Sequence, residues 1–131
     1  MLIGELATRV DVTTKTLRFY EGEGLLPPPR RTPAGYRDYD EHAVGRVRFV
    51  RSSQAAGFTL REIAAVLAAR DRGEAPCEHV QGLITRHLED IDRRLGELRR
   101  ARDELHALAA HARTVSPRDC PPESICRIIA A

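Results

Sequence analysis

Residues 77–111 have the sequence CEHVQGLITRHLEDIDRRLGELRRARDELHALAAH, and this stretch decides the fold. Its apolar side chains recur in alternating steps of four and three residues, which is the spacing of a coiled-coil heptad. The seam comprises Ile84, Leu88, Ile91, Leu95, Leu98, Arg102, Leu105 and Ala109, of which only Arg102 is polar. The pattern predicts one helix from Cys77 to about His111, about 50 Å long at a rise of roughly 1.5 Å per residue.

A helix of this length cannot be wrapped by the rest of a chain of 131 residues. We therefore expect its seam to be buried against a second copy, which makes the protein a homodimer. The alternative is a long helix packed along its own domain. In an antiparallel pair, Cys77 at the start of the helix would meet Cys120 and Cys126 of the partner subunit.

The charge distribution favours the N-terminal half as the basic part of the chain. Residues 1–70 hold 11 Lys and Arg against 8 Asp and Glu, whereas residues 71–131 hold 10 against 11. Arginines gather between Leu25 and Arg51, at Arg30, Arg31, Arg37, Arg46, Arg48 and Arg51. This patch is compatible with nucleic-acid binding, and the alternative is an ordinary solvated face.

Targeting and membrane signals are not found in the sequence. Residues 1–6, MLIGEL, lack the basic and apolar regions of a signal peptide, and no apolar run approaches the roughly 20 residues that span a bilayer. We expect a cytoplasmic protein without membrane contact. Three cysteines in a reducing compartment do not favour a structural disulfide.

The first 26 residues predict two short helices joined by a tight turn. Helical spacing of Ile3, Leu6, Ala7 and Val10 predicts a helix from Leu2 to about Arg9. Thr13 is the expected N-cap of a second helix, which runs from Thr14 to about Glu23 and stops at Gly24. The arrangement is that of a helix-turn-helix.

The rest of the N-terminal domain contains a proline-rich excursion and two more helices. Residues 25–39, LLPPPRRTPAGYRDY, hold four prolines and a turn glycine, which indicates a β wing or a rigid linker. Asp40 caps a third helix that ends at Gly57, and Thr59 with Glu62 forms a capping box for a fourth. After Ala112 we expect a loop, and then one or two helical turns within residues 123–131.

These elements predict a mainly α protein in three parts. Residues 1–70 form a winged helix-turn-helix DNA-binding domain, and residues 71–112 form a linker and the antiparallel dimerisation helix. Residues 113–131 form a C-terminal loop and short helix, and the family resemblance described next implies that this loop binds metal.

Three stretches resemble MerR-family transcription regulators, and together the resemblance covers essentially the whole chain. Residues 13–26, TTKTLRFYEGEGLL, resemble the family's recognition-helix signature. Residues 35–39, GYRDY, resemble its first wing, and residues 48–63 resemble its second helical pair. The resemblance implies a homodimer on promoter DNA with a long spacer. It also implies that the effector-bound form distorts this DNA so that RNA polymerase can use it, with the binding energy offsetting the cost of deforming the DNA.

The expected DNA contacts lie in the second helix and the wing. Arg18 lies one turn into the second helix, where a side chain reads base edges in the major groove. The full set of expected contacts is Thr14, Lys15, Arg18, Tyr20, Arg31, Tyr36, Arg37 and Arg48. For Tyr20, and for Tyr39, the alternative is core packing.

The three cysteines are the expected effector ligands. Thiolates select soft ions, namely zinc, cadmium, lead, mercury or copper(I). The resemblance implies that a cysteine at the Cys77 position accompanies divalent sensing, whereas copper(I) sensors tend to carry serine there. Cys120 and Cys126 match the cysteines of the family's metal loop, here with five residues between them. Three thiolates suit mercury or lead, and a fourth ligand, His79 or less favourably His111, would suit zinc or cadmium.

Other classes fit the sequence less well. The cysteines could be small buried residues, or Cys120 and Cys126 could form the disulfide of a thiol-redox regulator. An iron–sulfur cluster usually takes four closely spaced cysteines, and this chain has three. A multidrug-type regulator has a sizeable ligand domain after the long helix, whereas here only residues 113–131 follow it. No zinc-hydrolase motif or phosphate loop indicates an enzyme.

Overall fold

The computed structural model describes residues 1–130 of the 131-residue chain. The chain divides into two compact units, residues 1–87 and residues 88 onward, and each is described by itself. The described residues form five α-helices, two short strands and one 3-10 turn. This confirms the prediction of a mainly α protein with a winged helix-turn-helix and a long helix.

The helix-turn-helix consists of α1 (Ile3–Arg9) and α2 (Thr14–Gly22). As predicted, Thr13 caps α2, and its hydroxyl accepts a hydrogen bond from the Thr16 amide at 3.1 Å. The Val12 amide donates to the Ala7 carbonyl at 3.0 Å, which closes the turn between the helices.

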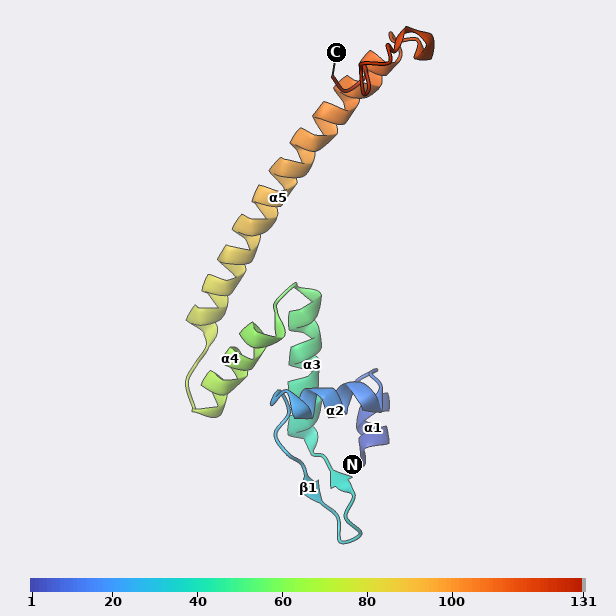
Figure 1. Cartoon of the computed structure of the whole chain (residues 1–131). Coiled ribbons are helices and arrows are strands. Elements are labelled where there is room, and N and C mark those ends of the chain that lie inside the picture. Colours follow the sequence, from blue (N-terminus) through green and yellow to red (C-terminus); the bar gives the residue numbers. More distant parts are fainter. Residues whose placement is uncertain (131) are drawn as a thin grey trace. The chain divides into compact units, whose positions relative to one another are not determined.

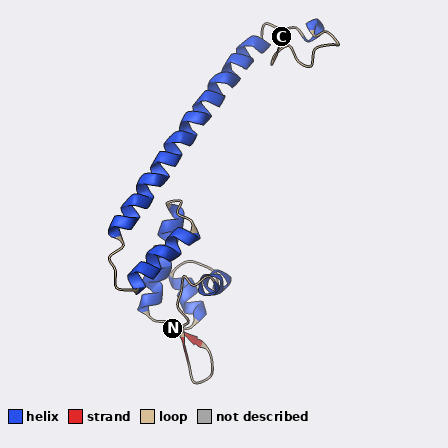
Figure 2. Ribbon diagram, turned by 60° about the vertical axis from the view of Figure 1, so that its left-hand side comes forward, coloured by secondary structure: helices blue, strands red, loops and turns tan. Residues whose placement is uncertain are grey.

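The wing is a hairpin of β1 (Arg30–Arg31) and β2 (Arg37–Asp38), drawn in red in Figure 2. The strands are antiparallel, and Arg31 pairs with Arg37. The turn uses Gly35 at a φ of +86°, a backbone conformation that side chains other than glycine disfavour. The predicted β wing is therefore present, and the rigid-linker alternative is wrong.

Two further helices, α3 (Glu41–Ala55) and α4 (Leu60–Asp71), complete the core of the N-terminal unit (Figure 1). Both expected caps are present, because Asp40 accepts from the Ala43 amide and Thr59 forms a reciprocal box with Glu62. The largest fully buried side chains are Leu6, Leu17, Leu25, Leu26, Val47, Val50 and Ile63.

The long helix is α5 (Cys77–Ala112), as the heptad pattern predicts. Its first turns belong to the N-terminal unit, where Leu83 is only 2% exposed and His87 contacts the Glu62 carboxylate at 2.9 Å. The large apolar members of the seam from residue 84 to residue 105 are 44–66% exposed, namely Ile84, Leu88, Ile91, Leu95, Leu98 and Leu105. The stripe is thus left uncovered within the described chain.

The C-terminal segment differs from the prediction. Its short helix is the 3-10 turn η1 (Pro117–Asp119), in a region expected to be loop. Residues 123–130 contain bends and turns and one backbone bond from the Ala130 amide to the Cys126 carbonyl, but no regular helix. The expected one or two helical turns are thus reduced to a single hydrogen-bonded turn between Cys126 and Ala130, and Ala131 lies outside the described residues. None of the helices in residues 1–130 is long and apolar enough to cross a membrane.

Candidate DNA-binding surface and metal ligands

The exposed face of α2 carries the expected base-reading residues. Lys15 and Arg18 are exposed and Thr14 is half-buried, whereas Leu17 and Tyr20 turn into the core. Residues 15 and 18 lie three apart, so they share one face of the helix. The helix therefore presents two cations on the side away from the core.

A hollow joins this face of α2 to the wing. Arg18 lines it together with the wing residues Arg31, Tyr36 and Arg37, and the opposite wall comes from the start of α1 at Leu2–Glu5. Tyr36 is 65% exposed. The structure thus brings four of the predicted DNA contacts to one basic concavity, which suits a polyanion.

Hydrogen bonds fix the shape of the wing. The Arg31 guanidinium donates to the Gly35 carbonyl at 3.0 Å, across the turn of the hairpin. Arg37 donates from Nε to Oε2 of Glu21 in α2 at 3.1 Å. The wing is therefore tied to the recognition helix by a side-chain contact.

Tyr20 is a core residue, and the prediction that it contacts DNA is wrong. Its side chain is 3% exposed, and its hydroxyl donates to the Gln54 side chain of α3 at 2.8 Å. The alternative of core packing therefore holds for Tyr20. It also holds for Tyr39, which is 5% exposed.

Phe19 was missed as a candidate contact. It is 48% exposed on α2, directly after Arg18 and four residues after Lys15. Residues four apart on a helix lie on one face, so Phe19 shares the face of Lys15. A helical-wheel comparison of Phe19 with the buried Leu17 would have indicated this position.

Arg48 lies apart from the hollow, exposed on α3. Its neighbour Arg51 donates to the Asp11 carbonyl at 3.1 Å, which attaches α3 to the turn of the helix-turn-helix. Arg48 remains a predicted phosphate contact, and Arg51 has a structural role.

The three cysteines are free thiols. Cys77 and Cys120 are exposed, and Cys126 is half-buried. Within residues 1–130 no three His, Cys, Asp or Glu side chains come together as a metal cluster. The donor set itself suits a soft cation, because accessible thiols deprotonate and bind soft ions when such an ion is present.

The loop between Cys120 and Cys126 is closed by the residues that flank it. The Arg127 guanidinium donates to the Asp119 carbonyl, immediately outside the two cysteines. The Arg127 carbonyl lies 3.1 Å from Nε2 of His111, near the end of α5. Both loop cysteines are therefore held on a segment anchored to the helix end.

The histidine candidates do not gain support from this geometry. His79 follows Cys77 by two residues in the first turn of α5, and positions two apart point to different sides of a helix. His111 is engaged by the Arg127 carbonyl. The arrangement argues against a single ion bound by both Cys77 and His79 of one chain.

A winged helix-turn-helix with a basic concavity, followed by a long helix with an uncovered heptad seam, defines a DNA-binding transcription regulator rather than an enzyme. The chain belongs to the MerR family. Residues 1–70 match the model of the MerR HTH family regulatory protein, and residues 44–108 match the MerR DNA-binding model.

Named relatives are heavy-metal regulators. The chain is 43% identical over 98 residues to a mercuric resistance operon regulatory protein of Bacillus cereus, covering 75% of this chain and 74% of that protein. It resembles the lead(II) complex of PbrR691 from Ralstonia metallidurans CH34 with a TM-score of 0.75 and 37% identity, over 98% and 96% of the two chains. It also resembles the mercury(II) complex of MerR from Bacillus megaterium MB1, with a TM-score of 0.66 and 32% identity over 98% and 95%.

Proposed function

We propose that this protein is a metal-responsive transcription regulator that binds promoter DNA as a homodimer. In this proposal a soft divalent ion (mercury, lead, cadmium or zinc) binds the thiolates of Cys77, Cys120 and Cys126. The loaded dimer then activates transcription by distorting the promoter for RNA polymerase. The observation that carries the proposal is the set of three free thiols, with Cys77 at the start of α5 and Cys120 and Cys126 in the segment after its end. It is supported by the likeness to a mercuric resistance operon regulatory protein and to a lead(II) complex of a transcription regulator.

The DNA-binding half rests on the concavity between α2 and the wing. We assign base contacts to Arg18, with Thr14 and Lys15 beside it, and phosphate contacts to Arg31, Tyr36, Arg37 and Arg48. Arg18 is exposed at the mouth of the hollow that the wing lines. Phosphate contacts position a protein on DNA, and base contacts give it sequence specificity.

Dimer formation is supported by the uncovered seam. Its large apolar side chains are 44–66% exposed within one chain, although a continuous apolar stripe is costly to leave in water. A second copy of the same helix, running antiparallel, covers the stripe with matching heptads. The same pairing places Cys77 of one protomer at the end of the helix that carries the loop cysteines of its partner.

The ion supplies a cross-link between thiolates, and the chain's own residues supply the rest of the response. Arg127 and His111 hold the cysteine loop against the helix end. A link from this loop to Cys77 of the other protomer biases the angle between the two DNA-binding units. A coupling free energy of about 1–3 kcal/mol between metal and DNA is typical of such switches.

Transcription in vitro tests the proposal. The reduced protein, its promoter and RNA polymerase are assayed with mercury(II), lead(II), cadmium(II), zinc(II) and copper(I), and then with Cys77→Ser. We expect a divalent ion to activate the wild type, and we expect Cys77→Ser to bind the promoter without being activated. The control is Thr85→Ser, an exposed position on the same helix.

A thiol-redox regulator is the second candidate, because Cys120 and Cys126 lie on one closed loop. Activation by a disulfide-forming oxidant in the absence of metal, with Cys77→Ser still responsive, would favour it. Activation by copper(I) alone would favour the copper sensor instead. Normal activation of Cys77→Ser by a divalent ion would contradict the proposed ligand set.

A further inference from the structure

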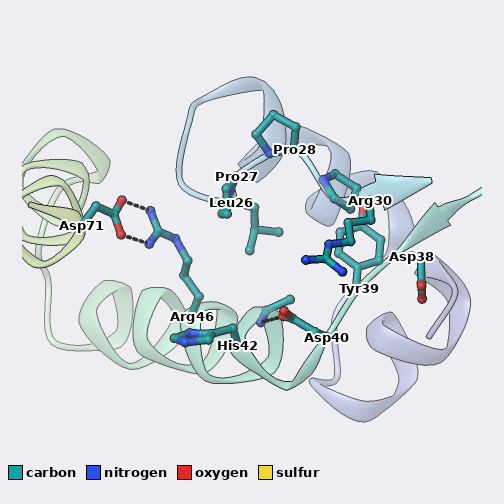
Figure 3. A pocket seen from close by; sticks show the side chains of 12 residues that line it. Leu26, Pro27, Pro28, Arg30, Asp38, Tyr39, Asp40, His42, Arg46 and Asp71 are labelled. Carbon is teal, nitrogen blue, oxygen red and sulfur yellow. Dashed lines mark hydrogen bonds and ion pairs between the residues drawn. The ribbon is translucent and has the colours of Figure 1, made fainter.

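A hollow on the N-terminal unit is bounded by an arginine that joins three segments (Figure 3). Residues 26–30 form one wall, and the start of α3 forms the other. Arg46 reaches out of α3 to Asp71, the last residue of α4, with two hydrogen bonds of 2.7 and 2.9 Å. This is a bidentate pair, which fixes the orientation of both groups.

The same guanidinium also holds the segment that leads to the wing. Nε of Arg46 donates to the carbonyl of Leu25, a residue only 1% exposed. Leu25 is followed by Leu26 and then by three prolines that end at β1. Prolines restrict the backbone, so a displacement at Leu25 is carried to the wing instead of being absorbed.

At its other end, Asp71 is close in the chain to Cys77. The end of α4 is closed by Gly73 at a φ of +80° and by the Glu74 amide, which donates to the Ala69 carbonyl at 3.0 Å. Helix α5 begins at Cys77, and its first backbone hydrogen bond runs from the Val80 amide to the Pro76 carbonyl at 2.9 Å. Only Ala75 and Pro76 therefore separate the last hydrogen-bonded amide at the end of α4, that of Glu74, from Cys77 at the start of α5.

A second hollow lies on the other side of the pair. Its lining includes Arg46 and Asp71 again, together with Phe49, Pro76 and Cys77. Arg46 and Asp71 thus border both the hollow beside the thiol and the hollow beside the wing segment.

We propose that the Arg46–Asp71 pair is a positioning pair that transmits effector binding at Cys77 to the DNA-binding wing. The inference rests on the proposed function. In this proposal, a movement of the Cys77 end of α5 is passed through the short linker to Asp71, and Arg46 follows through its two hydrogen bonds. The Leu25 carbonyl and the proline segment then shift the wing relative to α2.

The exposure of the pair separates this role from a stabilising one. The Asp71 side chain is 55% exposed, and the Arg46 side chain is 15% exposed. The Asp71 carboxylate is exposed to water, so removing its charge has a small effect on folding, whereas Arg46 keeps its bond to the Leu25 carbonyl. We expect removal of this charge to weaken the coupling between metal binding and promoter distortion instead.

The test compares Asp71→Asn with Glu74→Gln. Glu74 pairs with Arg72 at 3.1 Å in the same linker, but both side chains are about 60% exposed and neither reaches the wing segment. For each full-length dimer we would measure metal affinity by chelator competition, operator affinity with and without metal, and melting temperature. Promoter distortion is followed by the fluorescence of a base analogue at the operator centre.

We expect Asp71→Asn to keep metal affinity and metal-free operator affinity within about twofold of the wild type. The metal-dependent fluorescence change and activation should fall by about tenfold, while Glu74→Gln behaves as the wild type. Asp71→Glu restores a carboxylate and is expected to recover much of the response. Arg46→Lys keeps the positive charge but cannot form the bidentate pair, so we expect this variant to lose the metal response.

A full fluorescence change and full activation in Asp71→Asn would overturn the inference. The inference would also be overturned if Asp71→Asn lowered both the metal-free operator affinity and the melting temperature, because the pair would then have a purely structural role. If the wild type responds to no metal, the proposed function itself fails. If the wild type and Asp71→Asn both respond to metal, the proposed function stands and only the role of the pair fails.

Discussion

Arg37 in the wing and Glu21 in the recognition helix are joined by a 3.1 Å contact from Nε to Oε2 across 16 residues of sequence. The Tyr39 hydroxyl reaches the same carboxylate oxygen at 3.2 Å. Burial raises the pKa of Tyr39, and the charge of Glu21 raises it further, so the hydroxyl stays protonated and donates. One carboxylate therefore sets the position of the wing against α2.

Glu21→Gln is expected to weaken operator binding by releasing the wing. The amide keeps the size of the side chain but loses the charge that holds Arg37, and we expect about a threefold to tenfold loss of affinity. Fluorescence anisotropy with labelled operator measures it. Glu23→Gln, an exposed change just after α2, is the control, and equal affinity for both variants would contradict the role of Glu21.

Two neighbouring residues of α2 are expected to contact DNA directly. Arg18→Ala should lower operator affinity by about 10-fold to 100-fold, with or without metal, because a base-reading arginine contributes about 1–3 kcal/mol. Phe19→Ala should lower affinity as well, with a modest loss of melting temperature, since Phe19 is 48% exposed and its ring lies 6.1 Å from that of Tyr20.

Tyr20→Phe is the matched control for these variants. It removes the hydroxyl that donates to Gln54, so it should cost about 1 kcal/mol of folding stability and leave operator affinity of the folded protein unchanged. Chemical denaturation and anisotropy together separate the two effects. A large loss of affinity in Tyr20→Phe with unchanged stability would restore Tyr20 as a DNA contact.

The heptad seam of α5 is expected to hold the dimer. Leu95→Glu places a charge in the middle of the seam and should shift the protein to monomer in sedimentation experiments. Arg102→Leu removes the one polar seam residue and should strengthen association. If Leu95→Glu stays dimeric at micromolar concentration, α5 is not the dimer interface.

Acid is expected to loosen the contact between α4 and α5. The Thr59 amide and the His87 side chain hold the pKa of Glu62 below its ordinary value. A carboxylate with a lowered pKa in the folded state stabilises that state above the unfolded pKa, and this stabilisation is lost as pH falls through the folded pKa.

Glu62→Gln should therefore be less stable than the wild type at neutral pH and lose less stability below about pH 4.3. Thermal melts between acid and neutral pH measure the difference. Glu41→Gln, which breaks an exposed pair with Arg9, is the comparison. If Glu62→Gln shows the same dependence of melting temperature on pH as the wild type, the proposed role of this carboxylate is contradicted.

Local signals in the sequence were sufficient for most of the N-terminal unit. Thr13, Asp40 and Thr59 each cap the helix that was expected to follow, because capping depends on amides two or three residues away. Helix α5 could also be predicted, because one heptad periodicity runs along most of its length.

What could not be predicted depends on residues far apart in the chain. The Tyr20 hydroxyl donates to the Gln54 side chain of α3, a partner 34 residues away that no local pattern indicates. Arg46 appears in the sequence as one of six arginines in a basic stretch, whereas its partners Leu25 and Asp71 lie 21 and 25 residues away. The tail beyond α5 has no periodicity, and its 3-10 turn, Pro117–Asp119, is marked only by the Ser116 cap and the proline that follows it.

Metal titration of the reduced, metal-free dimer tests the central claim most directly. Under anaerobic conditions each of mercury(II), lead(II), cadmium(II), zinc(II) and copper(I) is added while the thiolate-to-metal absorption band is followed and a chelator competes. We predict a tight divalent site in the wild type that is lost in Cys77→Ser. A protein without such a site, or one whose site is indifferent to Cys77, would contradict a metal centre built from Cys77, Cys120 and Cys126.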